Sequence, residues 1–306
     1  MGKGQLRTFK VMISIVVVSY RSTAVLRKCL NALQSQIDSG DEVFVIENSK
    51  DQALCNWSVF EMPNFHLTIN EVNTGYTAGC NQGLSSTKNE WALLLNPDAY
   101  PMPGAIKQLK KELQSKEVRE IFAVELVNLD GSRQDYFRRF PSVRALIIMF
   151  FVPLKWQANF SAYRRYTYHT DFESRDSFEQ PPGAGLVVPS SIRLDEDFFI
   201  YGSDLMFCWE NSQKSKSEVQ LLPASFVHLR GQGGTNSSSD LADWLRVESA
   251  QGFALFFFKS GQRIRRQIWM VCYGLGEFCG ILWSLLFKHE QYHQRASRLK
   301  KFLKIV

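Results

Sequence analysis

The chain has 306 residues, of which 45% are hydrophobic and 22% charged, and its formal net charge is +6. This composition is ordinary for a globular protein, and the length allows one large domain or a domain with an appendage. The positive charge suggests anionic partners, but nucleic acid is disfavoured because no basic run is interleaved with aromatic residues.

The cysteines and the amino terminus indicate a cytosolic protein. The six cysteines, at positions 29, 55, 80, 208, 272 and 279, have neither metal-ligand spacing nor the density of a disulfide framework. We therefore expect free buried thiols in a reducing compartment. Residues 1–10 are polar, and they are too short to form a signal peptide with the apolar run after them.

The first part of the chain alternates predicted strands with predicted helices. Runs rich in β-branched and other apolar residues predict strands at 11–19, 42–47, 65–69 and 90–95. Helical patterning predicts helices at 23–36, 81–88 and 103–116. This alternation is typical of βαβ units and predicts a largely parallel sheet.

The stretch Trp91–Asp98 (WALLLNPD) is an apolar run that stops at a proline and a carboxylate. Pro97 cannot extend the strand, so Asp98 is expected at its carboxyl end, where open α/β sheets bind ligands. A hard divalent cation prefers carboxylate and phosphate oxygens, so Asp98 could hold a metal against a diphosphate. The alternative for this motif alone is an ordinary turn aspartate.

Polar turns also come after the other strands. Residues 19–22 succeed the first strand, residues 47–49 succeed the second, and residues 73–83 contain Gly75 and Gly79 before the next helix. Since the carboxyl ends of parallel strands meet in one crevice, such turns can bind a base and ribose, and glycines let the backbone approach a diphosphate. Neither a dinucleotide fingerprint nor a P-loop is present.

The order of these motifs resembles that of family 2 glycosyltransferases, and most of all their rhamnosyltransferase-like branch. The motifs are 16–20 (VVVSY), 47–49 (ENS), 73–81, 94–98 (LLNPD), 138–142 (RRFPS), 183–184, 194–201 (LDEDFFIY) and 227–228. The resemblance covers roughly residues 11–235 and implies an α/β, A-type nucleotide-sugar fold. In that fold a mostly parallel, Rossmann-like sheet is flanked by helices.

Carried over by position, the resemblance implies a donor site and a metal site. The residues implied to bind the nucleotide sugar are Ser19, Tyr20, Glu47, Asn48, Asn73, Gly75, Gly79, Asn81 and Asn96. Asp98 is the remaining acid of the family's metal-binding Asp-x-Asp, which implies Mg2+ or Mn2+ as cofactor. His228 is implied to complete the metal or diphosphate site, beside Arg230 and glycines at 231, 233 and 234.

Inverting transfer requires a general base that deprotonates the acceptor hydroxyl. The family's Glu-Asp-x-Asp motif aligns with residues 203–206 (SDLM), so Asp204 is the implied base and Ser203 and Met206 replace the flanking acids. The enzyme either uses Asp204 alone with a different acceptor or is a weakened member of the family. We interpret the nearby acids, Asp195, Glu196 and Asp197, as solvated turn residues.

Two apolar segments suggest where the acceptor lies. Residues 144–168 combine an apolar run with an aromatic and basic border, which suits acceptor-binding or lipid-binding structure or a core helix. Residues 268–287 contain one charge, Glu277, and have basic residues on both sides. Basic flanks at both ends favour an amphipathic or apolar helical extension lying in the cytoplasmic interface over a core or oligomer helix, and disfavour a true span.

Together these features predict a transferase domain at 1–240 and a membrane-associating helical region at 241–306. The first comprises a nucleotide-sugar-binding half at 11–100 and an acceptor and catalytic half at 101–240. The predicted function is inverting, metal-dependent transfer of a sugar, such as rhamnose from dTDP-rhamnose, to a bacterial surface glycan or polyprenyl-linked acceptor. The protein would lie at the inner face of the cell membrane, as a monomer or homo-oligomer.

Two alternatives to this function stay open. One is a catalytically idle sugar-nucleotide-binding subunit that assists a partner transferase. The other is a nucleotidyltransferase, which usually has a glycine-rich, basic loop soon after its first strand, and residues 19–23 (SYRST) contain no such loop.

Overall fold

The computed structural model describes residues 10–52, 54, 62, 64–230, 239–287 and 292–303. The predictions for residues 1–9, for Cys55 and for the glycines at 231, 233 and 234 lie outside these ranges. The strands are β1 (Ile13–Ser19), β2 (Glu42–Glu47), β3 (Phe65–Ile69), β4 (Trp91–Leu95), β5 (Ala99–Pro101), β6 (Phe122–Val127), β7 (Ser177–Phe178), β8 (Gly185–Pro189) and β9 (Val219–His228). The helices are α1 (Thr23–Gln34), α2 (Gly75–Leu84), α3 (Ala105–Leu113), α4 (Val143–Phe151), α5 (Leu154–Gln157), α6 (Ser161–Tyr166), the short 3₁₀ helix η3 (Phe172–Ser174), α7 (Ser203–Ser215), α8 (Ser239–Lys259), α9 (Arg263–Phe287) and α10 (Tyr292–Leu303).

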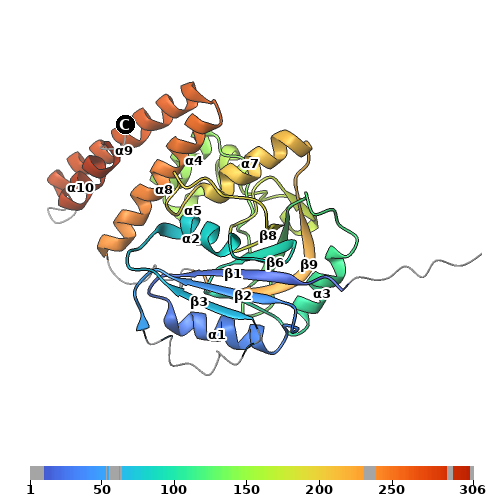
Figure 1. The fold of residues 1–306 in the computed structure, drawn as a ribbon. Helices are drawn as coiled ribbons and strands as arrows, with labels where there is room; N and C mark the ends of the chain where they lie inside the picture. The colour runs from blue at the N-terminus through green and yellow to red at the C-terminus, as the bar shows by residue number, and fades with distance from the viewer. Residues whose placement is uncertain are drawn as a thin grey trace, which may run out of the picture.

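All described strands form one sheet, with helices on its two faces (Figure 1). The order is β3-β2-β1-β4-β8-β6-β9-β5, with β7 paired to β9. Strands β3, β2, β1 and β4 are parallel, as the alternating pattern predicts, whereas β8 runs antiparallel to β4 and β6. The carboxyl ends of β1, β2 and β4 therefore meet at one edge of the sheet.

Side-chain alternation along β1 builds two cores from one strand. Ile15 and Val17 face the cluster formed with α1 and α3, and Val16 and Val18 face the cluster that contains residues of α2 and α7. Because both faces are covered, the strand is apolar without interruption from Ile15 to Val18, which explains why a β-branched run is a reliable strand signal.

The predicted start of the second helix is wrong. The sequence pattern predicts residues 81–88, but α2 runs from Gly75 to Leu84. Its glycines are the reason: a Cβ at Gly79 would lie 2.9 Å from Val18 Cγ1, and one at Gly83 would lie 2.4 Å from Val16 Cγ1. These glycines therefore let helix α2 pack closely on β1. Their low helix propensity predicts a loop instead, which is why the sequence pattern places the start of the helix too late.

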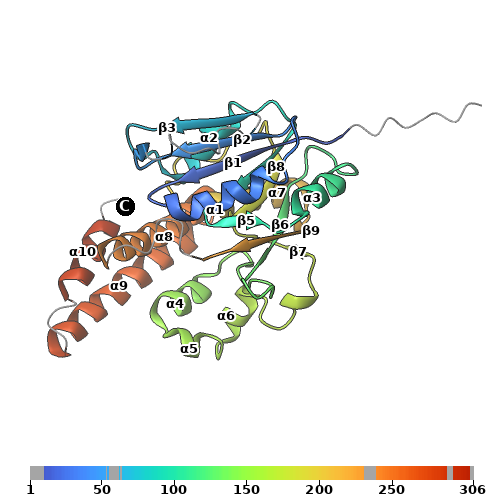
Figure 2. The ribbon, with the colours of Figure 1, turned by 90° about the horizontal axis from the view of Figure 1, so that it is seen from below.

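Helices α8, α9 and α10 form a layer to one side of the sheet (Figures 1 and 2). They share a third apolar cluster with α4 and α7, in which Leu146 and Trp269 are fully buried. Helix α4 is thus part of a core, but its buried Leu146 belongs to the cluster shared with α7, α8 and α9, and not to a cluster on the sheet, where the core-helix interpretation places it. Lys155 and Trp156 on α5 are exposed. The expectation of buried thiols holds for Cys29, Cys80 and Cys208, but Cys272 is partly exposed and Cys279 is exposed.

Helix α9 is long and apolar enough to cross a membrane by length and composition. Its single acid, Glu277, is fully buried and lies within ion-pair distance of three arginines. Arg246 of α8 is 3.4 Å from Glu277 Oε1, and Arg298 and Arg295 of α10 are 3.2 and 3.8 Å from Oε2. One side of α9 is therefore held by charged partners within a protein layer.

Candidate functional site

The first part of the site lies where β1 and β2 end side by side. Ser19 pairs with Glu47 in the strand register, and both side chains are fully buried. Glu47 Oε1 accepts hydrogen bonds from the backbone N–H, at 2.5 Å, and the hydroxyl of Ser49. Within the described residues Glu47 Oε2 has no hydrogen-bond partner. A buried carboxylate oxygen without a donor is energetically costly, so Glu47 is suited to accept an N–H from a bound ligand.

Asn48 and Asn81 organise the frame of the site. The Asn48 amide donates to the carbonyl of Gly75 at 3.0 Å, and its Oδ1 accepts from Asn70 at 2.8 Å. Asn81 bonds both backbone groups of Leu194, each at 2.8 Å. Both side chains are thus occupied by protein partners and position neighbouring loops.

The start of α2 is a tight turn. Asn73 Oδ1 accepts the N–H of Gly75 at 3.0 Å, and Gly75 has φ of +87°. A Cβ at Gly75 would lie 2.6 Å from the carbonyl oxygen of Phe199. Gly75 is therefore required both by its backbone conformation and by the close approach of the loop before α7. Beside the first strand end, Tyr20 is partly buried and has the Arg21 guanidinium 5.2 Å from its ring centre.

The candidate metal residues, Asp98 and His228, are far apart in the sequence and come together through the pairing of two strands. Strand β5 pairs with β9 so that Ala99 lies opposite His228, and Asp98 Oδ1 is 3.5 Å from His228 Nε2. Both side chains are nearly buried, at 3% and 9% exposed. His228 Nδ1 lies 2.9 Å from Oε1 of the buried Gln134, which orients the ring so that Nε2 faces Asp98.

Residues of these types fit Mg2+ or Mn2+. A carboxylate and an imidazole, with the imidazole held by a second polar side chain, are ligands that such a cation accepts. In the part of the chain that the structure describes, no group of three or more His, Cys, Asp or Glu could hold a metal. A bound cation would therefore need oxygen ligands from another source, such as a diphosphate.

Asp204 lies at the first turn of α7, near the end of β4. Its Oδ2 accepts the N–H of Gly183 at 3.1 Å and its Oδ1 accepts the N–H of Leu205 at 2.8 Å. Burial raises the pKa of the Asp204 carboxyl above its ordinary value, which these backbone hydrogen bonds partly oppose. A carboxylate with a raised pKa is a better proton acceptor than an exposed aspartate.

The short segment 183–184 connects the end of β4 to Asp204 on α7. The N–H of Asn96 donates to the carbonyl of Ala184 at 3.2 Å, next to the Gly183 amide that Asp204 accepts. The Tyr76 hydroxyl donates to the carbonyl of Gly183 at 2.9 Å. The peptide units at 183–184 therefore hold the end of β4, α2 and α7 together.

The acids before Asp204 have protein partners, although Glu196 and Asp197 are exposed in a turn, as the solvated-turn interpretation expects. Lys259 of α8 bonds Asp195 at 2.6 Å and also contacts Asp197. Glu196 accepts from Asn81 at 2.8 Å. These acids fasten the loop 194–201 to α8 and α2, which leaves Asp204 as the acid at the crevice.

Several residues at the site could not be found from sequence. Gln134, Tyr76 and Glu248 contact His228, Gly183 and the N–H of Ile200, respectively. Their partners lie 94, 107 and 48 residues away. Tyr76 lies inside the motif 73–81, but that motif does not predict its contact with Gly183, and Gln134 and Glu248 lie in no motif. Only the tertiary structure identifies these contacts.

Comparison with known proteins identifies the family of this chain. The model of "Glycosyl transferase family 2" matches residues 14–172, just over half of the chain. An uncharacterized glycosyltransferase of Haemophilus influenzae is 33% identical over 106 residues, which cover 34% of this chain and 35% of that protein, so the chain spans about a third of that relative. The uncharacterized glycosyltransferase YwdF of Bacillus subtilis is 21% identical over 233 residues, or 75% of this chain and 78% of YwdF.

A solved structure supports the fold. The mannosyltransferase PcManGT from Pyrobaculum calidifontis, in complex with GDP-Man and Mn2+, has a TM-score of 0.54 and 13% identity. The match covers 96% of this chain and 75% of that chain. At this identity the likeness shows the fold alone, and it confirms the expected α/β, A-type glycosyltransferase architecture.

Proposed function

We propose, from the premise that this chain belongs to glycosyltransferase family 2, that it performs inverting, metal-dependent sugar transfer with Asp204 as its base. The chain is a nucleotide-sugar glycosyltransferase. The observation that carries the finer proposal is that Asp204, in the first turn of α7, is joined through residues 183–184 to Asn96, two residues before Asp98 of the Asp98–His228 pair. The sugar we propose is rhamnose, from dTDP-rhamnose, on the strength of the motif resemblance.

The nucleotide would bind at the ends of β1 and β2. The Glu47 carboxylate oxygen that lacks a donor supports its role as acceptor of a base N–H. Ser19 and Tyr20 lie at the same strand end, and Asn73, Gly75 and Gly79 shape the adjacent turn and helix. We propose that Asn48 and Asn81 act on the donor through the loops they hold.

The base acts on the acceptor hydroxyl. Asp204 accepts the hydroxyl proton as that oxygen attacks the anomeric carbon, and the bond to the nucleoside diphosphate breaks on the opposite face of the sugar. The backbone hydrogen bonds of Asp204 fix the carboxylate for this approach. Asp98 and His228 would hold Mg2+ or Mn2+, which when bound offsets the negative charge of the departing diphosphate. The relative PcManGT was solved with GDP-Man and Mn2+, which supports this assignment.

The loss of acids beside Asp204 has a packing explanation. Ser203 is buried, and Met206 is buried in the cluster shared with α8 and α9. A carboxylate at either position would be desolvated. The substitutions that motivate an idle subunit therefore also suit an active enzyme whose C-terminal helices pack against α7.

The acceptor we propose is a bacterial surface glycan or a polyprenyl-linked glycan at the cytoplasmic face of the membrane. The exposed apolar residues of α9 support this location. We propose residues 1–240 as the transferase domain and 241–306 as the region that brings it to the membrane.

Purified protein, offered a panel of nucleotide sugars, tests the proposal. We expect turnover of one donor with Mn2+, loss of turnover with EDTA, and a fall in kcat of about 10²- to 10⁴-fold in Asp204→Asn. Asp197→Asn is the matched control and should retain most activity. Full activity of Asp204→Asn would refute the base assignment, and nucleotide binding without turnover of donor or lipid-extract acceptors would favour the idle subunit.

A further inference from the structure

Helix α9 carries a stripe of exposed apolar side chains, which we call the apolar face. Its residues are Ile264, Ile268, Val271, Leu275, Phe278 and Leu282, which are 46–73% exposed. Their spacing of three and four residues places them on one side of the helix. Large apolar residues concentrated in this way on a soluble domain mark an interaction surface.

The exposed charged side chains of α9 and α10 are all basic. Arg263 and Arg265 are exposed at the start of α9, and Lys300 and Lys301 are exposed on α10. Among the described residues of α9 and α10 the only acid is Glu277, which is buried among three arginines. Two copies of this surface would bring like charges together, whereas an anionic lipid surface complements them.

The helices beside α9 determine how it would meet lipid. On its inner side Trp269 donates to the carbonyl of Ala250 at 2.9 Å, and Glu277 is paired with α8 and α10. Helix α10 carries two exposed lysines and cannot enter hydrocarbon with α9. A helix with one apolar face and a charged, protein-bound opposite side lies in the plane of the interface.

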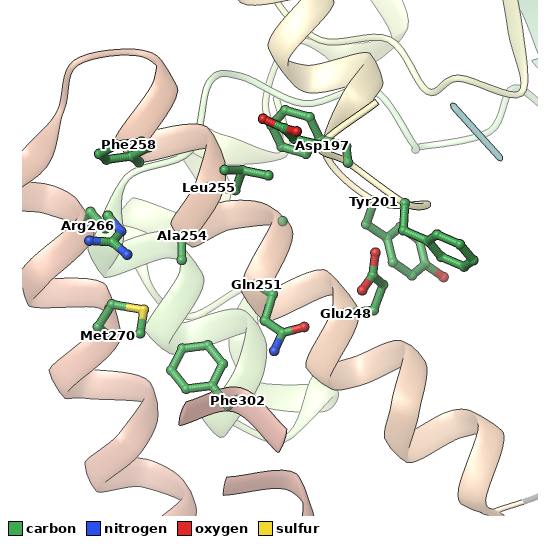
Figure 3. A pocket seen from close by; sticks show the side chains of 13 residues that line it. Asp197, Tyr201, Glu248, Gln251, Ala254, Leu255, Phe258, Arg266, Met270 and Phe302 are labelled. Atoms are coloured by element: carbon green, nitrogen blue, oxygen red, sulfur yellow. The ribbon is translucent and has the colours of Figure 1, made fainter. Parts of the chain in front are cut away.

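The loop before Asp204 lies on the opposite side of α9 from the apolar face. Arg266 and Met270 of α9 line an apolar cavity of about 210 Å³, together with α8, Phe302 and Tyr201 of the loop before Asp204 (Figure 3). Residues two apart on a helix point to different sides, so Ile268 of the apolar face is directed away from the cavity that Arg266 and Met270 line.

We infer that the apolar face of α9 docks on an anionic bilayer and that the reacting sugar of the acceptor stands off from the lipid surface. With the apolar face in the interface, α9 lies between the bilayer and the loop 197–201. A helix with its side chains is about 10–12 Å thick. The acceptor class that reaches Asp204 is therefore a lipid-linked glycan of more than one sugar, and this last step rests on the proposed function.

Vesicle binding tests the surface independently of catalysis. The full chain should sediment with phosphatidylglycerol vesicles, and not with phosphatidylcholine vesicles, in a salt-dependent manner. Leu275→Glu should weaken this binding about tenfold or more. The change removes a leucine side chain that the bilayer would bury, and it adds a negative charge that the anionic lipid repels. Leu129→Glu is the matched control, since Leu129 is 76% exposed in the turn after β6. The proposal would be overturned if Leu275→Glu bound vesicles as well as the wild type does, or if the wild type formed a stable dimer that did not bind vesicles.

Orientation is measured with an environment-sensitive dye on single cysteines. In a background with Cys55, Cys272 and Cys279 replaced by alanine and only the buried Cys29, Cys80 and Cys208 retained, a dye on Val271→Cys should shift to the blue on vesicles, and a dye on Tyr201→Cys should not. A shift at position 201 would refute the stand-off.

The acceptor class is read from the products made with a lipid extract of the source cells. Every product should carry the new sugar on an existing chain of sugars. Transfer to a sugar attached directly to the lipid would overturn the assignment of acceptor class. If no transfer occurs at all, the proposed function fails while the vesicle result still decides the surface.

Discussion

Replacing Gly83 by alanine separates a packing role for the α2 glycines from a donor-binding role. The new Cβ would lie 2.4 Å from Val16 Cγ1, 3.1 Å from Cγ2 and 3.3 Å from Cβ. Val16 is β-branched, 1% exposed and central in the sheet, so it has little freedom to move. Overpacking of this kind destabilises by about 1–3 kcal/mol.

Alanine also has a higher helix propensity than glycine, by roughly 0.5–1 kcal/mol. This gain in stability opposes the loss caused by the clash with Val16. Gly274 of α9 provides the matched control because a Cβ there meets no atom within 4 Å. Both variants replace a helical glycine by alanine, so the gain in helix propensity cancels when their free energies of unfolding are compared. The clash remains, and Gly83→Ala should be about 1–3 kcal/mol less stable than Gly274→Ala.

Urea unfolding followed by circular dichroism measures both variants, and equal m-values are needed for the comparison. The double variant Val16→Ala with Gly83→Ala should recover part of the clash term. Donor affinity of folded Gly83→Ala should stay near that of the wild type. Equal stability of the two single variants, combined with weakened donor binding, would refute the packing argument and assign Gly83 to the donor.

Three further changes test other parts of the structure. Burial raises the pKa of Asp204, so ionisation of this carboxyl lowers stability as pH rises from its unfolded to its folded pKa. Because asparagine does not ionise, Asp204→Asn should lose less Tm than the wild type over that rise in pH, and an equal or larger loss would contradict this. Glu277→Ala leaves Arg246 and Arg298 without their buried partner, so it should lower the free energy of unfolding in urea by about 3–5 kcal/mol. Replacing an exposed acid, as in Glu117→Ala, should lower it by under about 1 kcal/mol. His228→Ala should weaken Mn2+ activation roughly 10- to 100-fold, and an unchanged Mn2+ titration would exclude His228 as a ligand.

The sequence predicts the strands well because their pattern is local. β2 and β3 have the predicted bounds, since each is a short apolar or alternating run between turn residues. The start of α2 is missed because its glycines are explained only by contact with β1. Asp197 is an exposed turn acid, as predicted, but the ion pairs of Asp195 and Asp197 with Lys259 could not be predicted because Lys259 is more than 60 residues away. At the site, local motifs single out Asp98 and Asp204 as candidates, but the hydrogen bond between His228 and Gln134 needs the paired strands.

The bridge at residues 183–184 bears on how enzymes of this kind can be recombined. Asn96 and Tyr76 reach this segment from the amino-terminal half of the chain, and Asp204 reaches it from the carboxyl-terminal half. All three contacts use backbone atoms of the segment, so they do not depend on its side chains. A chimera that joins the donor half of one relative to the acceptor half of another would therefore keep its base in register if the crossover preserves the backbone path of these two residues. Exchange of donor specificity between such enzymes is constrained at this junction more than at the surface of either half.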